Sequence, residues 1–115
     1  MLTRGDFHSV FRNGYRRRSR HLHLVLRGNS LGYSRIGLAV SRKVGSAVLR
    51  NLIKRRLREL FRRNRDLFEE ATDVVVIPQP GTGELSFQQL SDEFLRMLSG
   101  PTEVISQLGQ KEARR

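Results

Sequence analysis

The chain has 115 residues, no cysteine and a formal net charge of +11, because it contains 22 lysine and arginine residues but only 11 aspartate and glutamate residues. This length suits one domain with a modest core, and the lack of cysteine excludes disulfides, cysteine zinc sites and thiol catalysis. No apolar run approaches the roughly 18 residues of a membrane span, and MLTRGDF lacks a signal peptide's apolar stretch. We therefore expect a cytoplasmic protein whose partner is a polyanion, with nucleic acid as the obvious candidate.

A first helix is predicted from Thr3 onward. Thr3 and Asp6 have the spacing of a capping box, Phe7 and Phe11 lie on one helical face, and Gly14 can end the helix. The arginine cluster RRRSR then leads into the first predicted strand.

Three main strands are predicted. Alternating leucines in 21–27 indicate a half-buried strand, and Ile36, Leu38 and Val40 alternate in the same way. The turn-forming residues 28–32 separate these two strands, which predicts an antiparallel hairpin. The continuous apolar run Asp73–Ile77 is typical of a strand buried on both faces.

Two further helices have clear start signals. Ser46 is a candidate N-cap for a long helix that runs to about Phe61 or beyond. Ser86 and Gln89 have capping-box spacing and open a last helix that ends near Gly100. We expect a domain over residues 1–100, followed by a polar tail of uncertain order over 101–115.

The helix after Ser46 is strongly basic on one side. An apolar stripe is formed by Leu49, Ile53, Leu57 and Leu60. Like charges recur at i, i+4 spacing, which destabilises an isolated helix. A solvated amphipathic face is the alternative, but the net charge favours phosphate binding. A basic helix can also enter the major groove of DNA, but the sequence lacks a helix-turn-helix, a zinc finger and a leucine zipper. RNA is preferred on this absence together with the family resemblance described below. The ladder consists of Arg50, Lys54, Arg58 and Arg62, beside Asn51 and Arg55.

Catalytic and metal-binding patterns are weak. His21 and His23 lack a third ligand, and Asp66, Glu69 and Glu70 sit in a charged segment without a nearby histidine. We assign no catalytic residue and no metal ligand to the chain, and a protein-only nuclease is disfavoured.

The run RIGLAVSRKVGSAVLRNLIKRRLRE, residues 35–59, closely resembles the signature of the bacterial ribonuclease P protein component. DFHSVFRNG near the start and DVVVIP with the later SF resemble the same family, so the likeness covers about residues 1–98. One position departs from it, because Leu52 stands where the family's Arg-Asn-Arg element has its second arginine.

The resemblance implies a single α+β domain of order αβββαβα, with a central, mostly antiparallel sheet and a left-handed βαβ crossover that carries the basic helix. It also implies a protein subunit of an endoribonuclease whose catalytic RNA performs the chemistry. That enzyme hydrolyses the phosphodiester between the 5′ leader and precursor tRNA, with Mg²⁺ bound mainly by the RNA subunit and the substrate. The protein would bind leader and ribozyme and lower the Mg²⁺ requirement, with neither a membrane nor an obligate protein partner.

By the same resemblance, two groups of residues contact RNA. For the aromatic residues of the second group, a place in the core is the alternative, and for the whole chain the alternative is a ribosomal-type or general RNA-chaperone protein. The RNA-binding group is Arg42, Lys43, Arg50, Asn51, Lys54, Arg55, Arg58 and Arg62. The leader-binding cleft consists of Phe7, Phe11, Arg12, Arg16, Arg17 and His23.

Overall fold

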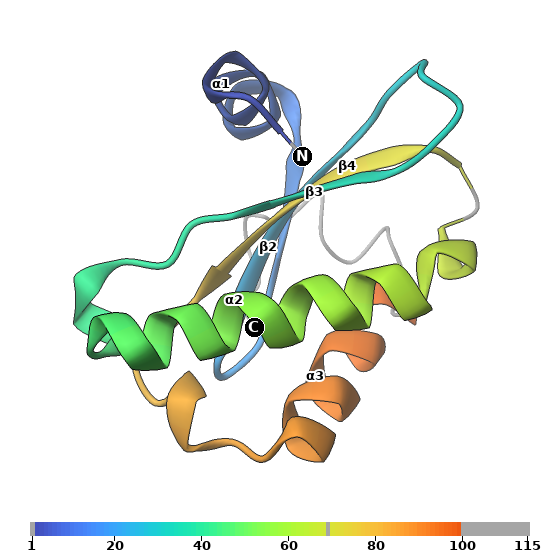
Figure 1. The fold of residues 1–115 in the computed structure, drawn as a ribbon. Helices are drawn as coiled ribbons and strands as arrows, with labels where there is room; N and C mark the ends of the chain where they lie inside the picture. Colours follow the sequence, from blue (N-terminus) through green and yellow to red (C-terminus); the bar gives the residue numbers. More distant parts are fainter. Residues whose placement is uncertain (1, 69, 100–115) are drawn as a thin grey trace.

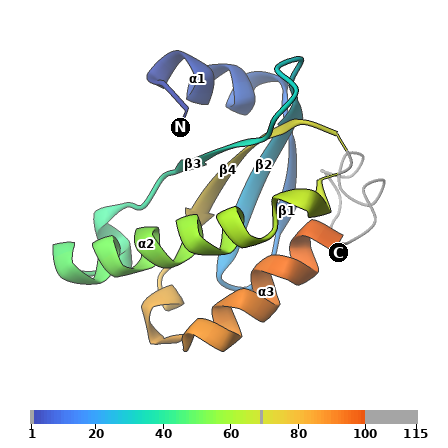
Figure 2. The ribbon, with the colours of Figure 1, turned by 45° about the vertical axis from the view of Figure 1, so that its right-hand side comes forward.

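A mixed four-stranded sheet runs through the middle of the protein, with helices on both of its faces (Figure 1). The computed structural model describes residues 2–68 and 70–99. One face carries α1, and the other carries α2 and α3 (Figure 2). The order αβββαβα is confirmed, with short 3₁₀ turns at Arg42–Val44, Arg65–Leu67 and Thr82–Glu84. The elements are α1 (Arg4–Asn13), β1 (Tyr15–Arg18), β2 (Leu22–Gly28), β3 (Arg35–Leu38), α2 (Ala47–Arg63), β4 (Thr72–Pro78) and α3 (Phe87–Ser99).

The predicted hairpin between β2 and β3 is wrong. The strand order is β1-β2-β4-β3, so β4 lies between the two strands, antiparallel to β2 and parallel to β3. β2 instead forms its hairpin with β1, a strand that the arginine cluster concealed. β4 is flanked by strands on both sides and covered on both faces. Its side chains are therefore apolar in a continuous run instead of alternating with polar ones.

The parallel pair β3 and β4 is joined through α2. Viewed with α2 in front of the sheet and both strands pointing up, β4 lies to the left of β3 (Figure 1). The crossover is therefore left-handed, whereas about 98% of such connections are right-handed.

The predicted helix starts are confirmed. Thr3 and Asp6 form the capping box of α1, and the Ser46 hydroxyl accepts from the Leu49 amide at the start of α2. At the start of α3, the Ser86 hydroxyl accepts from the Gln89 amide at 3.1 Å. These side chains satisfy amide groups that have no partner within the first helical turn.

Each face of the sheet has its own core. The leucines of β2 pack against α2 and α3, as the alternation predicted. On the other face, Val10 of α1 packs against Val25, Val75 and Leu2. Val25 was expected on the outer side of a half-buried strand, but α1 covers it. The predicted tail, residues 101–115, lies outside the described residues, and none of the described helices is long and apolar enough to cross a membrane.

We predict that Gly37→Ala displaces α1. A Cβ at this position would lie 2.7 Å from Phe7 Cζ and 2.8 Å from Leu2 Cδ1, both on the α1 side of the sheet. Such overpacking lowers the free energy of unfolding by about 1–3 kcal/mol, which urea denaturation measures. Gly5→Ala is the matched control: its nearest neighbour is 3.9 Å away, and alanine favours the helix by up to about 1 kcal/mol. Equal stability of Gly37→Ala and the unaltered protein would contradict this packing.

Candidate nucleic-acid interface

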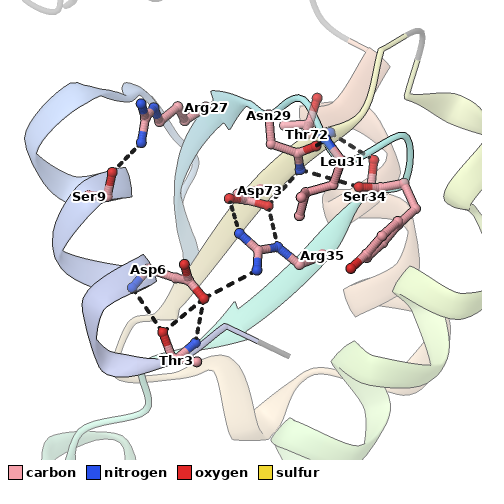
Figure 3. Close-up of polar contacts among 11 residues, drawn as sticks. Thr3, Asp6, Ser9, Arg27, Asn29, Leu31, Ser34, Arg35, Thr72 and Asp73 are labelled. Atoms are coloured by element: carbon pink, nitrogen blue, oxygen red, sulfur yellow. Dashed lines mark hydrogen bonds and ion pairs between the residues drawn. The ribbon is translucent and has the colours of Figure 1, made fainter.

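A partly buried ion-pair network joins α1 to the sheet (Figure 3). Arg35 of β3 donates from Nε and Nη2 to the two carboxylate oxygens of Asp73, at 2.9 and 2.8 Å, and its Nη1 lies 3.2 Å from Asp6 Oδ2. Asp6 also completes the capping box of α1 with the N-cap residue Thr3, so one guanidinium joins β3, β4 and the start of the helix. At the helix's other end, Arg27 of β2 donates to the Ser9 hydroxyl.

The charges of this network are mutually stabilising. Hydrogen bonds from the Thr3 backbone and side chain, and then Arg35, lower the pKa of Asp6 below its ordinary value. The hydrogen bond to Asp73 is the largest of several effects that raise the pKa of Arg35. Asn29 completes the partners of Asp73 by donating from Nδ2 at 2.7 Å.

Two aromatic rings of α1 lie at the border between its core and the surface. Phe7 and Phe11 are half-buried, with ring centroids 6.3 Å apart, and both pack against the core beneath α1. The guanidinium of Arg16 lies 5.8 Å from the Phe11 ring centroid. The two phenylalanines therefore belong partly to the core and partly to the surface, and Arg12 is exposed beside them.

The arginines of β1 point alternately to opposite faces of the sheet. Arg16 and Arg18 lie on the α1 face and are exposed. Arg17 points the other way: it is buried, donates to the carbonyl of Met97 in α3 and stacks 5.7 Å from the Tyr15 ring centroid. The arginine cluster forms a β-strand, in which successive side chains point to opposite faces of the sheet. The structure therefore does not bring Arg17 into the predicted leader-binding cleft.

The two histidines near the start of β2 have different surroundings. His23 is half-buried on the α1 face, paired across the strands with Arg18 and Ile77. Burial, and then Arg18 and Arg16, lower the pKa of His23 below its ordinary value. His21 instead contacts Glu93 of α3, with Nδ1 to Oε1 at 2.9 Å.

Glu93 fastens α3 to the turn between β1 and β2. Burial raises its pKa, but hydrogen bonds from the Ser19 hydroxyl and from the His21 amide and ring outweigh burial, so the net shift is downward. This histidine and glutamate pair is therefore structural and lies outside the predicted interface.

The basic helix α2 has the predicted two-sided character. Ile53, Leu57 and Leu60 are buried against the sheet. Arg50 is half-buried and folds back so that Nε donates to the Gly45 carbonyl at 3.1 Å, and Lys54 is also half-buried. The exposed members of the predicted group are Arg42, Lys43, Asn51, Arg55, Arg58 and Arg62.

Glu59 neutralises the last turn of α2. It accepts from Arg62 and Arg63 at 2.6 Å each, and these hydrogen bonds lower its pKa to about 2. Arg62 is therefore already paired, whereas within residues 2–68 and 70–99 no carboxylate forms an ion pair with Arg55 or Arg58. Leu52, at the departure from the family pattern, is half-buried and belongs to neither core cluster.

Apart from Arg17, which points toward α3, the two predicted groups lie on opposite sides of the sheet. The helix α1, with Phe7 and Phe11, is on one face, and the exposed side of α2 is beyond the other (Figures 1 and 2). Among the described residues, no three histidine or acidic side chains are grouped as metal ligands would be. Sequence reasoning missed Arg35, Asp73 and Arg18. The available signal for the ion pair between Arg35 and Asp73 was the position of Asp73 at the start of an apolar run.

The fold and the charge distribution define the class of protein. It is a small α+β domain in which a basic helix packs across a mixed sheet. The family model for Ribonuclease P matches residues 1–101. The ribonuclease P protein component of Syntrophus aciditrophicus is 33% identical over 104 residues, 90% of this chain and 87% of that protein. The corresponding Thermotoga maritima protein is 39% identical over 97 residues, 84% of this chain and 76% of that protein.

The solved structures that this chain resembles are also RNase P proteins. The Thermotoga maritima RNase P protein in complex with 1-(4-fluorophenyl)-2-thiourea has a TM-score of 0.81 and 34% identity, covering 88% of this chain and 98% of that chain. The Staphylococcus aureus RNase P protein has a TM-score of 0.77 and 27% identity, covering 85% and 90%. The chain belongs to the ribonuclease P protein component family.

We predict that Glu59→Gln strengthens binding to a polyanion. The substitution releases two arginines from their intramolecular partner, so the protein should elute from a heparin column at higher salt. Because Glu59 is ionised well below neutral pH, the difference should be constant from about pH 6 to about pH 8. Arg55→Gln should elute earlier than the unaltered protein, and Arg96→Gln, an exposed arginine of α3, is the matched control. Earlier elution of Glu59→Gln would contradict the prediction.

Proposed function

We propose that this chain is the RNA-binding subunit that helps a catalytic RNA to remove the 5′ leader from precursor tRNA. The observation that carries the proposal is the presence of two separate basic surfaces, one on each side of the sheet. The exposed side of α2 is suited to a structured RNA, because its cations follow one line along a rigid helix. The surface formed by Phe7, Phe11 and Arg16 is suited to an unpaired strand, because rings can stack on bases while arginine contacts phosphate.

Two surfaces would allow the protein to bind ribozyme and leader at the same time. RNA strands repel one another, and the cations of the protein offset part of that repulsion, so less Mg²⁺ is needed to reach the same geometry. The described residues offer no cluster of carboxylates or histidines suited to the ion. We therefore assign Mg²⁺ to the RNA subunit and to substrate phosphates, and the hydrolytic chemistry to the RNA.

A general RNA-chaperone protein is the competing function. Such a protein would bind structured RNA with a steep dependence on salt, but would have no preference for a substrate that carries a leader. The face of α1 favours the first proposal, because a second, aromatic surface serves no purpose for a protein that holds only duplex RNA.

The decisive measurement is multiple-turnover cleavage of precursor tRNA by a bacterial ribonuclease P RNA at low millimolar Mg²⁺, with and without this protein. We expect the protein to accelerate cleavage, and more so for long than for short leaders. Substituting both Arg55 and Arg58 with glutamine removes two phosphate contacts and should weaken assembly with the RNA by about tenfold or more at moderate salt. Arg96→Gln is the control. Tight RNA binding without faster cleavage would favour the chaperone function instead.

A further inference from the structure

The α1 face includes two arginines of a short edge strand. The strand order places β1 (Tyr15–Arg18) at one edge of the sheet, and within residues 2–68 and 70–99 its only strand partner is β2. Arg16 and Arg18 point to the α1 face and are exposed. A strand of four residues with one neighbour is held less firmly than β4, which has a neighbour on each side. Contacts outside the sheet must therefore contribute to the position of β1.

The first such contact is made by the buried side chain of Arg17. This residue lies between the two exposed arginines of β1 and points to the opposite face, where its guanidinium donates to the Met97 carbonyl. Met97 is in the last turn of α3, where helical carbonyl groups have no partner within the helix. A positive charge at this end of a helix is also favourable. Arg17 thus joins the middle of β1 to the end of α3.

The second contact lies just beyond the end of β1. Glu93 of α3 is buried, and it accepts hydrogen bonds from the Ser19 hydroxyl and from the His21 amide, the latter at 2.8 Å. Ser19 directly follows the last residue of β1. Glu93 and Met97 are four residues apart, so they lie on the same side of α3. One side of this helix therefore holds both the middle of β1 and the turn that follows it.

We propose that α3 positions the arginines that face the leader from the opposite side of the sheet, through the contacts of Arg17 and Glu93 with β1 and the turn after it. The inference rests on the proposed function and adds Arg17 and Glu93 to it as positioning residues. Neighbouring residues of a strand are linked through the backbone, so a shift of Arg17 displaces Arg16 and Arg18 as well. Arg16 would then lose its place 5.8 Å from the Phe11 ring centroid, beside which the proposed function places a nucleotide.

The basic helix α2 has its own contacts with α3. Arg56 donates to the Leu85 carbonyl at 3.3 Å, and the guanidinium of Arg63 lies 5.6 Å from the Phe87 ring centroid. These contacts join α2 to the start of α3 and to the residues before it, whereas Arg17 contacts the last turn. Loss of the Arg17 contact should therefore weaken binding of the leader and leave assembly with the catalytic RNA unchanged.

The test is steady-state cleavage of precursor tRNA by the holoenzyme reconstituted with Arg17→Met, which keeps an unbranched buried side chain but removes the guanidinium donors. With a long leader we expect KM to rise by about tenfold at unchanged kcat, because binding is lost equally from the ground state and the transition state. With a short leader KM should equal that of the unaltered protein, and so should the affinity for the catalytic RNA. A general loss of stability would not separate the two leaders in this way.

Three further variants make the result specific. Arg56→Met is the matched control: it also removes an arginine that donates to a backbone carbonyl, but one outside β1, so the difference between leaders should stay that of the unaltered protein. Arg17→Lys keeps a charged donor and should restore most of the affinity for the long leader. Ser19→Ala removes one hydrogen bond to Glu93, so it should raise KM for the long leader by less than Arg17→Met does.

Two outcomes would overturn the positioning role. One is an equal change of KM for long and short leaders in Arg17→Met and in Ser19→Ala, and the other is no change of KM for either leader in these variants. The proposed function would stand in both cases, because it depends on leader-dependent stimulation by the unaltered protein. Absence of that stimulation would overturn the proposed function and the positioning role together.

Discussion

The guanidinium of Arg35 is the contact that defines the α1 face. It binds both oxygens of the buried Asp73 and reaches the capping carboxylate Asp6, so the start of α1 cannot shift along the sheet without breaking an ion pair. Bidentate geometry makes the orientation of Arg35 specific as well as favourable. Removal of one partner would leave a charge without compensation in a largely buried place, which is why such pairs hold geometry more strongly than exposed ones. This contact positions α1, and α1 in turn positions Phe7 and Phe11.

The position of β4 explains which parts of the fold were predictable. Helix starts at Thr3, Ser46 and Ser86 were predicted correctly because capping is a local hydrogen-bond pattern. Pairing of strands is not local. The short turn after β2 favoured a hairpin, but β4, more than thirty residues later, provides an apolar partner for both strands. Only the family resemblance supplied the crossover and its unusual hand.

Prediction of the candidate site was limited in the same way. The cations of α2 could be assigned to a solvent face because helical periodicity separates them from the leucines. The cluster from Arg16 to Arg18 was not recognised as a strand, so its members were grouped by charge alone. Alternation then places Arg17 beneath α3 and Arg16 and Arg18 on the α1 face. The partner of Arg62, by contrast, is Glu59, one helical turn earlier in the sequence.

The ion pairs of the acidic residues determine which basic side chains keep an unbalanced positive charge. Asp6 and Asp73 bind Arg35, Glu59 binds Arg62 and Arg63, and Glu93 holds α3 to the turn after β1. Asp6, Asp73 and Glu93 therefore join elements of the fold, whereas Glu59 neutralises two exposed arginines at the end of α2. In the described part of the chain, no carboxylate forms an ion pair with Arg16, Arg18, Arg55 or Arg58, so the positive charges of these four exposed arginines are not offset by an ion pair. The sheet separates the two surfaces that the proposed function assigns to two different RNA segments (Figure 2).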